Sequence, residues 1–276
     1  MLFDIHTHAF HPKIAAKAVA HLNKAYGISC IGDGTIESLL AREDRLGLDG
    51  CVILCAATTP SQVVPANDHA ISLLTSHPRV IPFGTLHPEY PDWEKELSRL
   101  AAAGIRGIKF HPDFQGFRLD DPRLLPIFEH CQGRFLFQIH VGADAPPERS
   151  PSCPAKMAAI LDAFPDLTMI VGHMGGYRHW TLAMEVLPSD RYPNLWYDTS
   201  SVSPFVDAPL LRQVLGAFDR ERMVFGTDWP LFDPVEEVER LQSMGGLSMG
   251  EIEGFMENAA ALLGEWYAMP TSGNRG

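Results

Sequence analysis

The sequence predicts a single-domain (β/α)₈ TIM barrel of the α/β class over residues 1–276, on three observations. Eight short apolar runs recur at fairly even intervals, stretches with helical periodicity lie between them, and no Gly/Ser-rich linker divides the chain. Nearly all-apolar strands that alternate with helices are typical of a parallel sheet covered by helices, and eight such units suit a closed barrel. The predicted strands are 2–6, 51–57, 80–86, 105–111, 135–141, 168–173, 195–200 and 223–228.

The segments between these strands have the pattern of amphipathic helices. In residues 36–47, apolar side chains at positions 36, 39, 40 and 46 follow a 3.6-residue period, and Thr35 is placed to cap the helix. Gly or Pro ends most of the other segments. We expect further helices at 68–78, 92–104, 122–131, 154–165, 208–219, 235–245 and 251–267. Residues 9–34 form one long interruption after the first strand, where they could cover a site.

The composition excludes several classes of partner. The chain carries 22 Lys+Arg against 34 Asp+Glu, a net charge of −12, and an acidic chain without a basic stripe repels nucleic acid and anionic membranes. No run approaches the ~18 apolar residues of a membrane span. No secretory signal opens the chain, so we expect a cytoplasmic protein. Five cysteines without Cys-x-x-Cys spacing argue against a disulfide framework and a structural zinc site.

Polar side chains collect at the C-terminal ends of five of the eight predicted strands. They are His6 and His8 after the first strand, Lys109 and His111 after the fourth, His140 after the fifth, His173 after the sixth, and Asp228 with Trp229 after the eighth. Active sites of α/β barrels form at this end, because the loops that follow the strands converge there. The distribution therefore predicts one site that draws on several strands.

The residue types at these ends favour metal binding. His6 and His8 are two residues apart, which places both imidazoles on one face of a strand, and imidazole and carboxylate suit Zn²⁺ and related ions. Taken alone, a His-x-His pair is more often a pair of surface or capping histidines, and Asp228 has the position of a helix cap. The joint occurrence at one end of several strands makes coincidence improbable, so the pattern predicts a metal centre.

Several motifs in this order and spacing resemble the amidohydrolase superfamily, and more narrowly its amidohydrolase-2 branch. They are DIHTH, GIKFHP, QIHVG, VGHMGG, FGTDWP and the closing MENAAALLG. The branch includes aminocarboxymuconate-semialdehyde decarboxylase and resorcylate decarboxylase enzymes alongside many uncharacterised hydrolases. The resemblance covers the chain nearly end to end. It is specific for the superfamily but poorly specific for the reaction.

The resemblance implies a divalent metal ion, with Zn²⁺ expected and Mn²⁺ as the alternative, and favours one ion over two. Its implied ligands are His6, His8, His140 and Asp228. His173 corresponds to the histidine that orients water or polarises the substrate in mononuclear members and binds a second ion in binuclear members. Lys109 lies near the bridging-ligand position of binuclear members. Lys109, His111 and His173 are therefore candidates for a second metal site or for substrate binding.

Two reactions fit these groups. The leading hypothesis is a hydrolase that attacks a C–O or C–N bond of a small metabolite through metal-activated water, with Asp228 as the proton shuttle and His173 as a second catalytic residue. The alternative is a non-oxidative decarboxylase of a hydroxylated aromatic or muconate-type acid, in which protonated Asp228 or His173 delivers a proton to carbon. A remote alternative is a catalytically silent metal-binding barrel.

The loops at the same end carry the candidates for substrate contact. They are Phe114, Arg118, Arg149, Tyr177, Arg178 and Trp229. A mixture of aromatic side chains and arginines suits a small substrate that is aromatic or carboxylated. The alternative for each arginine, a pair with a surface acid, is equally open. The sequence also leaves the oligomeric state open, with a homodimer as one alternative.

Overall fold

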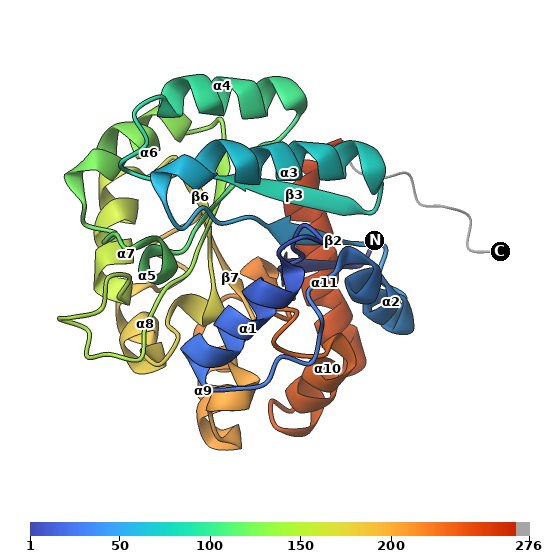
Figure 1. Ribbon diagram of the computed structural model, residues 1–276. Coiled ribbons are helices and arrows are strands. Elements are labelled where there is room, and N and C mark those ends of the chain that lie inside the picture. The colour runs from blue at the N-terminus through green and yellow to red at the C-terminus, as the bar shows by residue number, and fades with distance from the viewer. Residues whose placement is uncertain (269–276) are drawn as a thin grey trace.

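The computed structural model of the protein describes residues 1–268. Eight strands form one parallel sheet in which each strand pairs with the next along the chain, and helices surround the sheet (Figure 1). The strands are β1 (Phe3–Thr7), β2 (Gly50–Leu54), β3 (Val80–Thr85), β4 (Gly107–Phe110), β5 (Leu136–Ile139), β6 (Thr168–Val171), β7 (Leu195–Asp198) and β8 (Met223–Val224). The predicted barrel architecture is confirmed.

The helices are α1 (Ala15–Tyr26), α2 (Ile36–Leu46), α3 (Val63–Ser76), α4 (Trp93–Ala103), α5 (Pro112–Gln115), α6 (Leu125–Cys131), α7 (Pro154–Ala163), α8 (Trp180–Val186), α9 (Ala208–Ala217), α10 (Pro234–Ser243) and α11 (Met249–Gly264). The predicted helices are present, and the Thr35 side chain accepts a hydrogen bond from the backbone N–H of Ser38, as expected for a cap. Three helices are not predicted by the sequence pattern: α1, α5 and α8. No helix within residues 1–268 is long and apolar enough to cross a membrane.

The barrel closes between β1 and the residues that follow β8. The backbone N–H of Ile5 donates to the carbonyl of Phe225 at 2.8 Å, and the N–H of Asp228 donates to the carbonyl of His6 at 2.8 Å. β8 is only two residues long, shorter than the predicted strand 223–228, because residues 225–229 meet β1 through separate hydrogen bonds outside a regular ladder. The seam between β1 and residues 225–229 therefore depends on individual hydrogen bonds rather than on a long ladder.

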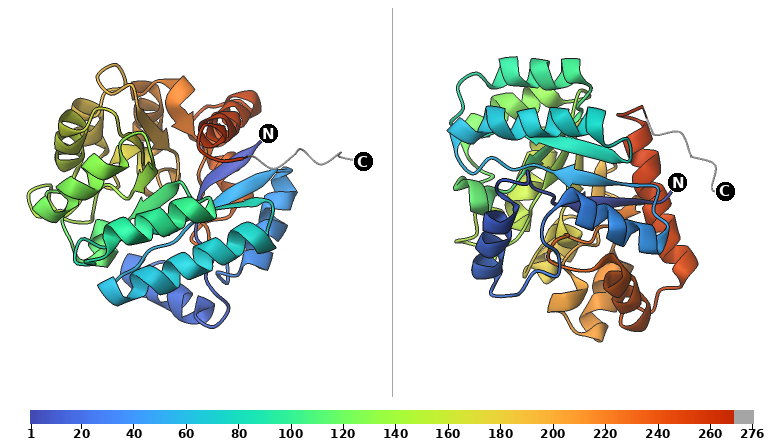
Figure 2. Two further views of the ribbon diagram at one scale, coloured as in Figure 1. Left: turned by 90° about the horizontal axis from the view of Figure 1, so that it is seen from above. Right: turned by 45° about the vertical axis from the view of Figure 1, so that its right-hand side comes forward.

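The interior of the barrel is filled from its N-terminal end. Buried side chains from five other strands pack there with Phe3 and Ile5, and side chains from the last turns of α11 cover them at this end. The hydroxyl of Tyr267 accepts hydrogen bonds from the backbone N–H groups of Arg106 and Gly107, at the start of β4. Figure 2 shows the start of the chain beside α11, at this closed end. The opposite, C-terminal end is left for the polar residues.

Candidate metal centre

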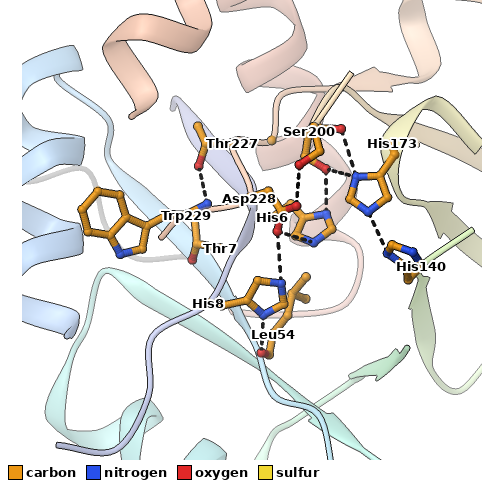
Figure 3. A network of polar contacts seen from close by, with 12 residues as sticks. His6, Thr7, His8, Leu54, His140, His173, Ser200, Thr227, Asp228 and Trp229 are labelled. Atoms are coloured by element: carbon orange, nitrogen blue, oxygen red, sulfur yellow. Dashed lines mark hydrogen bonds and ion pairs between the residues drawn. The ribbon is translucent and has the colours of Figure 1, made fainter. Parts of the chain in front are cut away.

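Three of the predicted ligands meet at the C-terminal end of the barrel. Nε2 of His6 lies 3.5 Å from Oδ1 of Asp228, and Nε2 of His8 lies 3.4 Å from the same oxygen (Figure 3). One ligand atom from each of the three residues lies within 4.8 Å of the other two. Two imidazole nitrogens and one carboxylate oxygen therefore face a common point, and this donor set fits a divalent ion such as Zn²⁺ or Mn²⁺.

A β-bulge in β1 orients the two histidines. Residues 4–7 of β1 advance three positions while their partners 51–53 of β2 advance two, so β1 carries one extra residue. Ile5 packs inside the barrel, and after the bulge His6 also faces inward, where it contacts side chains of β4 and β7. Thr7 points the other way and donates a hydrogen bond to the carbonyl of Val52. Alternation then places His8 on the same side as His6.

The second nitrogen of each imidazole is already engaged. Nδ1 of His6 lies 2.9 Å from Oδ2 of Asp198, and Nδ1 of His8 lies 3.1 Å from the carbonyl oxygen of Leu54. Both partners are acceptors, so each Nδ1 carries the proton and each Nε2 presents a lone pair. Hydrogen bonds of this kind commonly fix the tautomer and orientation of metal-binding histidines. The two Nε2 atoms are therefore prepared as ligands.

The charges of these groups suit a cation. Burial lowers the pKa of His6 to about 4, with nearby Lys109 as the next cause. Burial alone would raise the pKa of Asp228, but the neighbouring His6, a hydrogen bond with His8 and the charge of His173 hold it well below its ordinary value. A neutral His6 imidazole beside an ionised carboxylate is the combination of protonation states that binds a divalent metal.

Asp198, at the end of β7, is a functional candidate that the sequence analysis missed. Besides facing His6, its Oδ2 accepts a hydrogen bond from Nε2 of Gln138 at 2.7 Å. Its Oδ1 accepts from the backbone N–H groups of His173 at 3.0 Å and Ser200 at 3.1 Å, and from the Ser200 hydroxyl. One buried carboxylate thus joins β1, β5, β6 and β7. The sequence did contain a signal for Asp198, because the predicted strand 195–200 also ends in polar residues.

His140, the fourth predicted ligand, lies beside the centre but outside the group of three. Its Nδ1 is 2.8 Å from Nε2 of His173, whose own Nδ1 is 3.0 Å from the carbonyl of Ser200. The ring of His140 stacks on His111 with centroids 3.9 Å apart and planes 11° apart. Its Nε2 is 3.1 Å from the carbonyl of Gly142. Its role as a metal ligand stays a prediction.

A second group of candidate ligands lies beside the first. His111, Asp113 and His140 also bring ligand atoms within 4.8 Å of one another. However, imidazole lone pairs lie in the ring plane, and two nearly parallel rings stacked 3.9 Å apart direct theirs side by side rather than toward one point. This second group is therefore poorly arranged for an ion, and a single ion at His6, His8 and Asp228 stays the prediction.

Lys109 is buried in the wall of the centre. Its side chain is 0% exposed, and Nζ lies 3.4 Å from Nε2 of His6. Burial lowers the pKa of this lysine to about 8, against the opposing charges of Asp198 and Asp228. A buried amine at this place offers a cation to an anionic substrate group.

Left-handed backbone conformations accompany the centre. His173, Ser201 and Asp228 have φ values of 60°, 52° and 64°, in a region that costs a non-glycine residue free energy and persists only where the surrounding structure enforces it. The hydroxyl of Ser201 donates to Oδ2 of Asp228 at 2.5 Å, which leaves Oδ1 for the two histidines. Such conformations cluster at functional sites.

Aromatic rings pack against the histidines beside the centre. Phe114 stacks on His111 with centroids 4.2 Å apart, and Tyr177 lies 6.0 Å from the ring of His173. Tyr26, at the end of the unpredicted helix α1, packs edge-on against both Phe114 and Tyr177. Its hydroxyl lies 3.2 Å from Nε2 of His111. The expectation that residues 9–34 could cover a site agrees with this arrangement, although the sequence did not single out Tyr26.

Four other candidates for substrate contact are not brought to the centre. Arg118 is exposed and pairs with Asp120, and Arg149 is exposed. Arg178 is exposed at the rim, where its guanidinium lies over the rings of Tyr177 and Phe205.

Trp229, the last of these four candidates, does not line the centre either, contrary to the expectation from the sequence. Its indole is fully buried and points away from the centre (Figure 3), where a side chain at Gly32 would collide with it. The indole therefore has no exposed surface for a substrate to contact, and it packs against the segment 9–34 at Gly32.

Comparisons with known proteins agree with the fold and with the motifs. A family model described as "Amidohydrolase" matches residues 56–264. The chain is 26% identical over 198 residues to 2-amino-3-carboxymuconate-6-semialdehyde decarboxylase of Dictyostelium discoideum. This match covers 59% of the chain and 55% of the relative, so the chain spans about half the length of the curated relative it matches.

Two similar solved structures are also decarboxylases. One is 2,6-dihydroxybenzoate decarboxylase in complex with 2,6-dihydroxybenzoate, with 16% identity, a TM-score of 0.69 and coverage of 95% of this chain and 99% of that one. The other is a dihydroxybenzoic acid decarboxylase of Polaromonas with bound manganese and the inhibitor 2-nitroresorcinol, with 15% identity, a TM-score of 0.68 and coverage of 97% and 98%. At these identities the likeness establishes the fold alone.

Proposed function

Because this chain belongs to the amidohydrolase family, we propose that it is a metal-dependent, non-oxidative decarboxylase of a small aromatic or conjugated carboxylic acid. One observation carries the proposal: a fully buried lysine, Lys109, lies beside the predicted metal ligand His6, and aromatic rings pack against the neighbouring His111. A cation supplies the partner that a substrate carboxylate needs when it leaves water, and the rings suit a planar substrate.

A hydrolase as the main activity is the weaker hypothesis. The curated relative and the two solved structures described above are decarboxylases, and this is the reaction that the sequence analysis held as its alternative. The aromatic rings also favour decarboxylation, since removal of CO₂ requires a desolvated carboxylate rather than a water molecule beside it. A catalytically silent barrel would have no use for a buried lysine at this place.

The metal would be held by His6, His8 and Asp228, with His140 as the further predicted ligand. When bound, a divalent ion supplies a Lewis acid that binds substrate oxygen atoms and stabilises negative charge. Manganese is the first ion to test, because the Polaromonas enzyme contains it, and zinc is the second. The donor atoms of this chain suit either ion.

The proton that replaces the carboxylate is assigned to His173. Asp228 is a poor donor because its surroundings keep it ionised, so a role as proton shuttle is less suitable for it than a role as ligand. His173 is buried, and its Nδ1 is held by the carbonyl of Ser200. In the reaction the C–C bond to the carboxylate breaks, CO₂ leaves, and the electron pair that stays on carbon takes the proton.

The test is an assay of CO₂ release by the purified protein loaded with Mn²⁺ or Zn²⁺. 2,6-Dihydroxybenzoate and a panel of related hydroxybenzoates and muconate-type acids are the substrates, and a matched panel of lactones, esters and amides tests hydrolysis. In D₂O the product should carry one deuterium at the carbon that lost its carboxylate. We expect His173→Asn to lower kcat by roughly 10²–10⁴-fold with the metal content unchanged. Hydrolysis without release of CO₂ would refute the proposal.

A further inference from the structure

Asp4 is a buried carboxylate that the proposed chemistry does not use. It is 0% exposed, and it lies on β1 between Phe3 and Ile5, which pack inside the barrel. Asp4 therefore points to the outer side of the strand, away from the metal centre. Burying a carboxylate is unfavourable unless hydrogen bonds compensate for the lost water, so its partners indicate why it is there.

The partners of Asp4 are parts of the two segments that carry the ligands. Its Oδ1 accepts a hydrogen bond from the backbone N–H of His6 at 3.0 Å and one from the backbone N–H of Thr227 at 3.2 Å. Its Oδ2 accepts from the hydroxyl of Thr227 at 2.5 Å. The same hydroxyl oxygen accepts from the backbone N–H of Trp229 at 3.2 Å. One carboxylate thus joins His6 to the residues on both sides of Asp228.

The seam at this place has few other connections. β8 ends at Val224, and the residues that follow meet β1 through separate backbone hydrogen bonds. The bulge in β1 takes the N–H of His6 out of the regular ladder, and Asp4 supplies its acceptor. Without Asp4, a buried N–H group at a predicted ligand would have no partner, and the distance between β1 and residue 227 would be less well defined.

We propose that Asp4 and Thr227 are positioning residues of the metal centre, which set the distance between the strand of His6 and His8 and the segment of Asp228. Neither side chain touches the ligand atoms, and both act through the backbone. The inference rests on the proposed metal site but not on the reaction that the site performs.

Glu43 is a second buried carboxyl group next to Asp4. It projects from α2, is 0% exposed, and within residues 1–268 neither of its carboxyl oxygens has a hydrogen-bond partner. Burial, followed by the negative charge of Asp4, raises the pKa of Glu43 well above its ordinary value. The two buried carboxyl groups therefore face each other, which favours the protonated form of Glu43 beside Asp4.

The experiment measures metal binding in Asp4→Asn and Thr227→Val. We expect each variant to bind Mn²⁺ roughly 10–100-fold more weakly in competition with a chelator, the usual effect of removing a group that orients a ligand. We also expect the visible absorption of the Co²⁺-substituted protein to change, because this spectrum reports coordination geometry. Thr227→Ser keeps the hydroxyl and should restore both properties.

A matched control separates positioning from stability. Glu96 is also a buried carboxylate, but it lies on α4 and pairs with Asn67 and Arg99 away from the centre. Glu96→Gln should lower the unfolding free energy and leave Mn²⁺ affinity and the Co²⁺ spectrum unchanged.

Unchanged metal affinity and an unchanged spectrum in Thr227→Val would overturn the inference, even if Asp4→Asn did not fold. A wild-type protein that binds neither ion would overturn it as well. Metal binding without CO₂ release would refute only the decarboxylase, and the effect of Thr227 would remain measurable.

Discussion

Replacing Lys109 by Met should make the metal-free protein more stable at neutral pH while it abolishes decarboxylation. Lys109 is fully buried, and its pKa falls from 10.5 to about 8. The free energy that the charged amine loses by leaving water therefore exceeds the free energy that it gains from Asp198 and Asp228. A methionine of similar length fills the same space without a charge. A stabilising substitution that removes activity is what a site built for function rather than stability should show.

The magnitude follows from the displacement of the pKa of Lys109. A fall from 10.5 to about 8 corresponds to about 3 kcal/mol at ~1.4 kcal/mol per unit. The folded-state pKa lies below the unfolded one, so the unfolded chain binds the proton more readily and the cost is fully present below pH 8. The cost disappears as the pH rises from 8 to 10.5. Lys109→Met should thus raise the unfolding free energy of the metal-free protein by up to about 3 kcal/mol at pH 7. For a chain of this size, this corresponds to roughly 5 °C in Tm.

The assay is urea unfolding of the chelator-treated protein at pH 7 and pH 10, together with CO₂ release by the metal-loaded protein. The advantage of Lys109→Met over wild type should shrink at pH 10. Lys95 is an exposed lysine on α4, and Lys95→Met should change neither stability nor activity. A Lys109→Met protein that is less stable than wild type at pH 7 would show that the lysine is held by favourable pairing, and would refute the reasoning.

Three further outcomes follow from the same groups. Asp198→Asn keeps the shape of the side chain but removes the charge opposite Nδ1 of His6. The affinity for Mn²⁺ should therefore fall roughly 10–100-fold. An unchanged affinity in chelator competition would argue against a role of Asp198 in orienting His6. The lowered pKa of His6, about 4, means that the unfolded chain takes up the proton first, so the unfolding free energy of the metal-free protein should fall by up to about 3 kcal/mol between pH 6.5 and 4. His6→Asn should flatten this part of the profile in urea titrations. Tyr26→Phe removes the hydroxyl that contacts His111, so KM for the aromatic acid should change several-fold with kcat nearly constant, and an unchanged KM would exclude Tyr26 from substrate binding.

Local pattern was sufficient to predict the elements of the barrel and several members of the centre. Strands 2–6 and 135–141 are apolar runs with a histidine at or next to their last residue, and a buried strand needs no information beyond its own side chains to be recognised. The cap at Thr35 is equally local, because its hydroxyl bonds to an N–H group three residues away. His6, His8 and Asp228 could be proposed as neighbours because all strands of a parallel barrel end at the same mouth.

Other features depend on contacts that no local pattern contains. Asp198 satisfied the same rule as the other strand ends, but its role became visible only through its contact with His6, 192 residues away. Trp229 follows Asp228 directly, yet its indole faces the segment 9–34 at Gly32 instead of the centre. Tyr26 belongs to a helix with only one buried residue, Ala15, so its position depends on ring contacts with Phe114 and Tyr177 rather than on burial in the core.

The sequence by itself determined that eight strands would form and which of them would end in side chains suited to metal binding, because period and residue type are properties of short segments. The tertiary structure decided which of those side chains meet. Closure of the barrel brings residues 4–8 beside residues 225–229, and the bulge in β1 and the bonds of Asp4 to Thr227 direct His6, His8 and Asp228 to one point. These orientations arise from the fit between segments more than 200 residues apart, so they exist only once the barrel is closed.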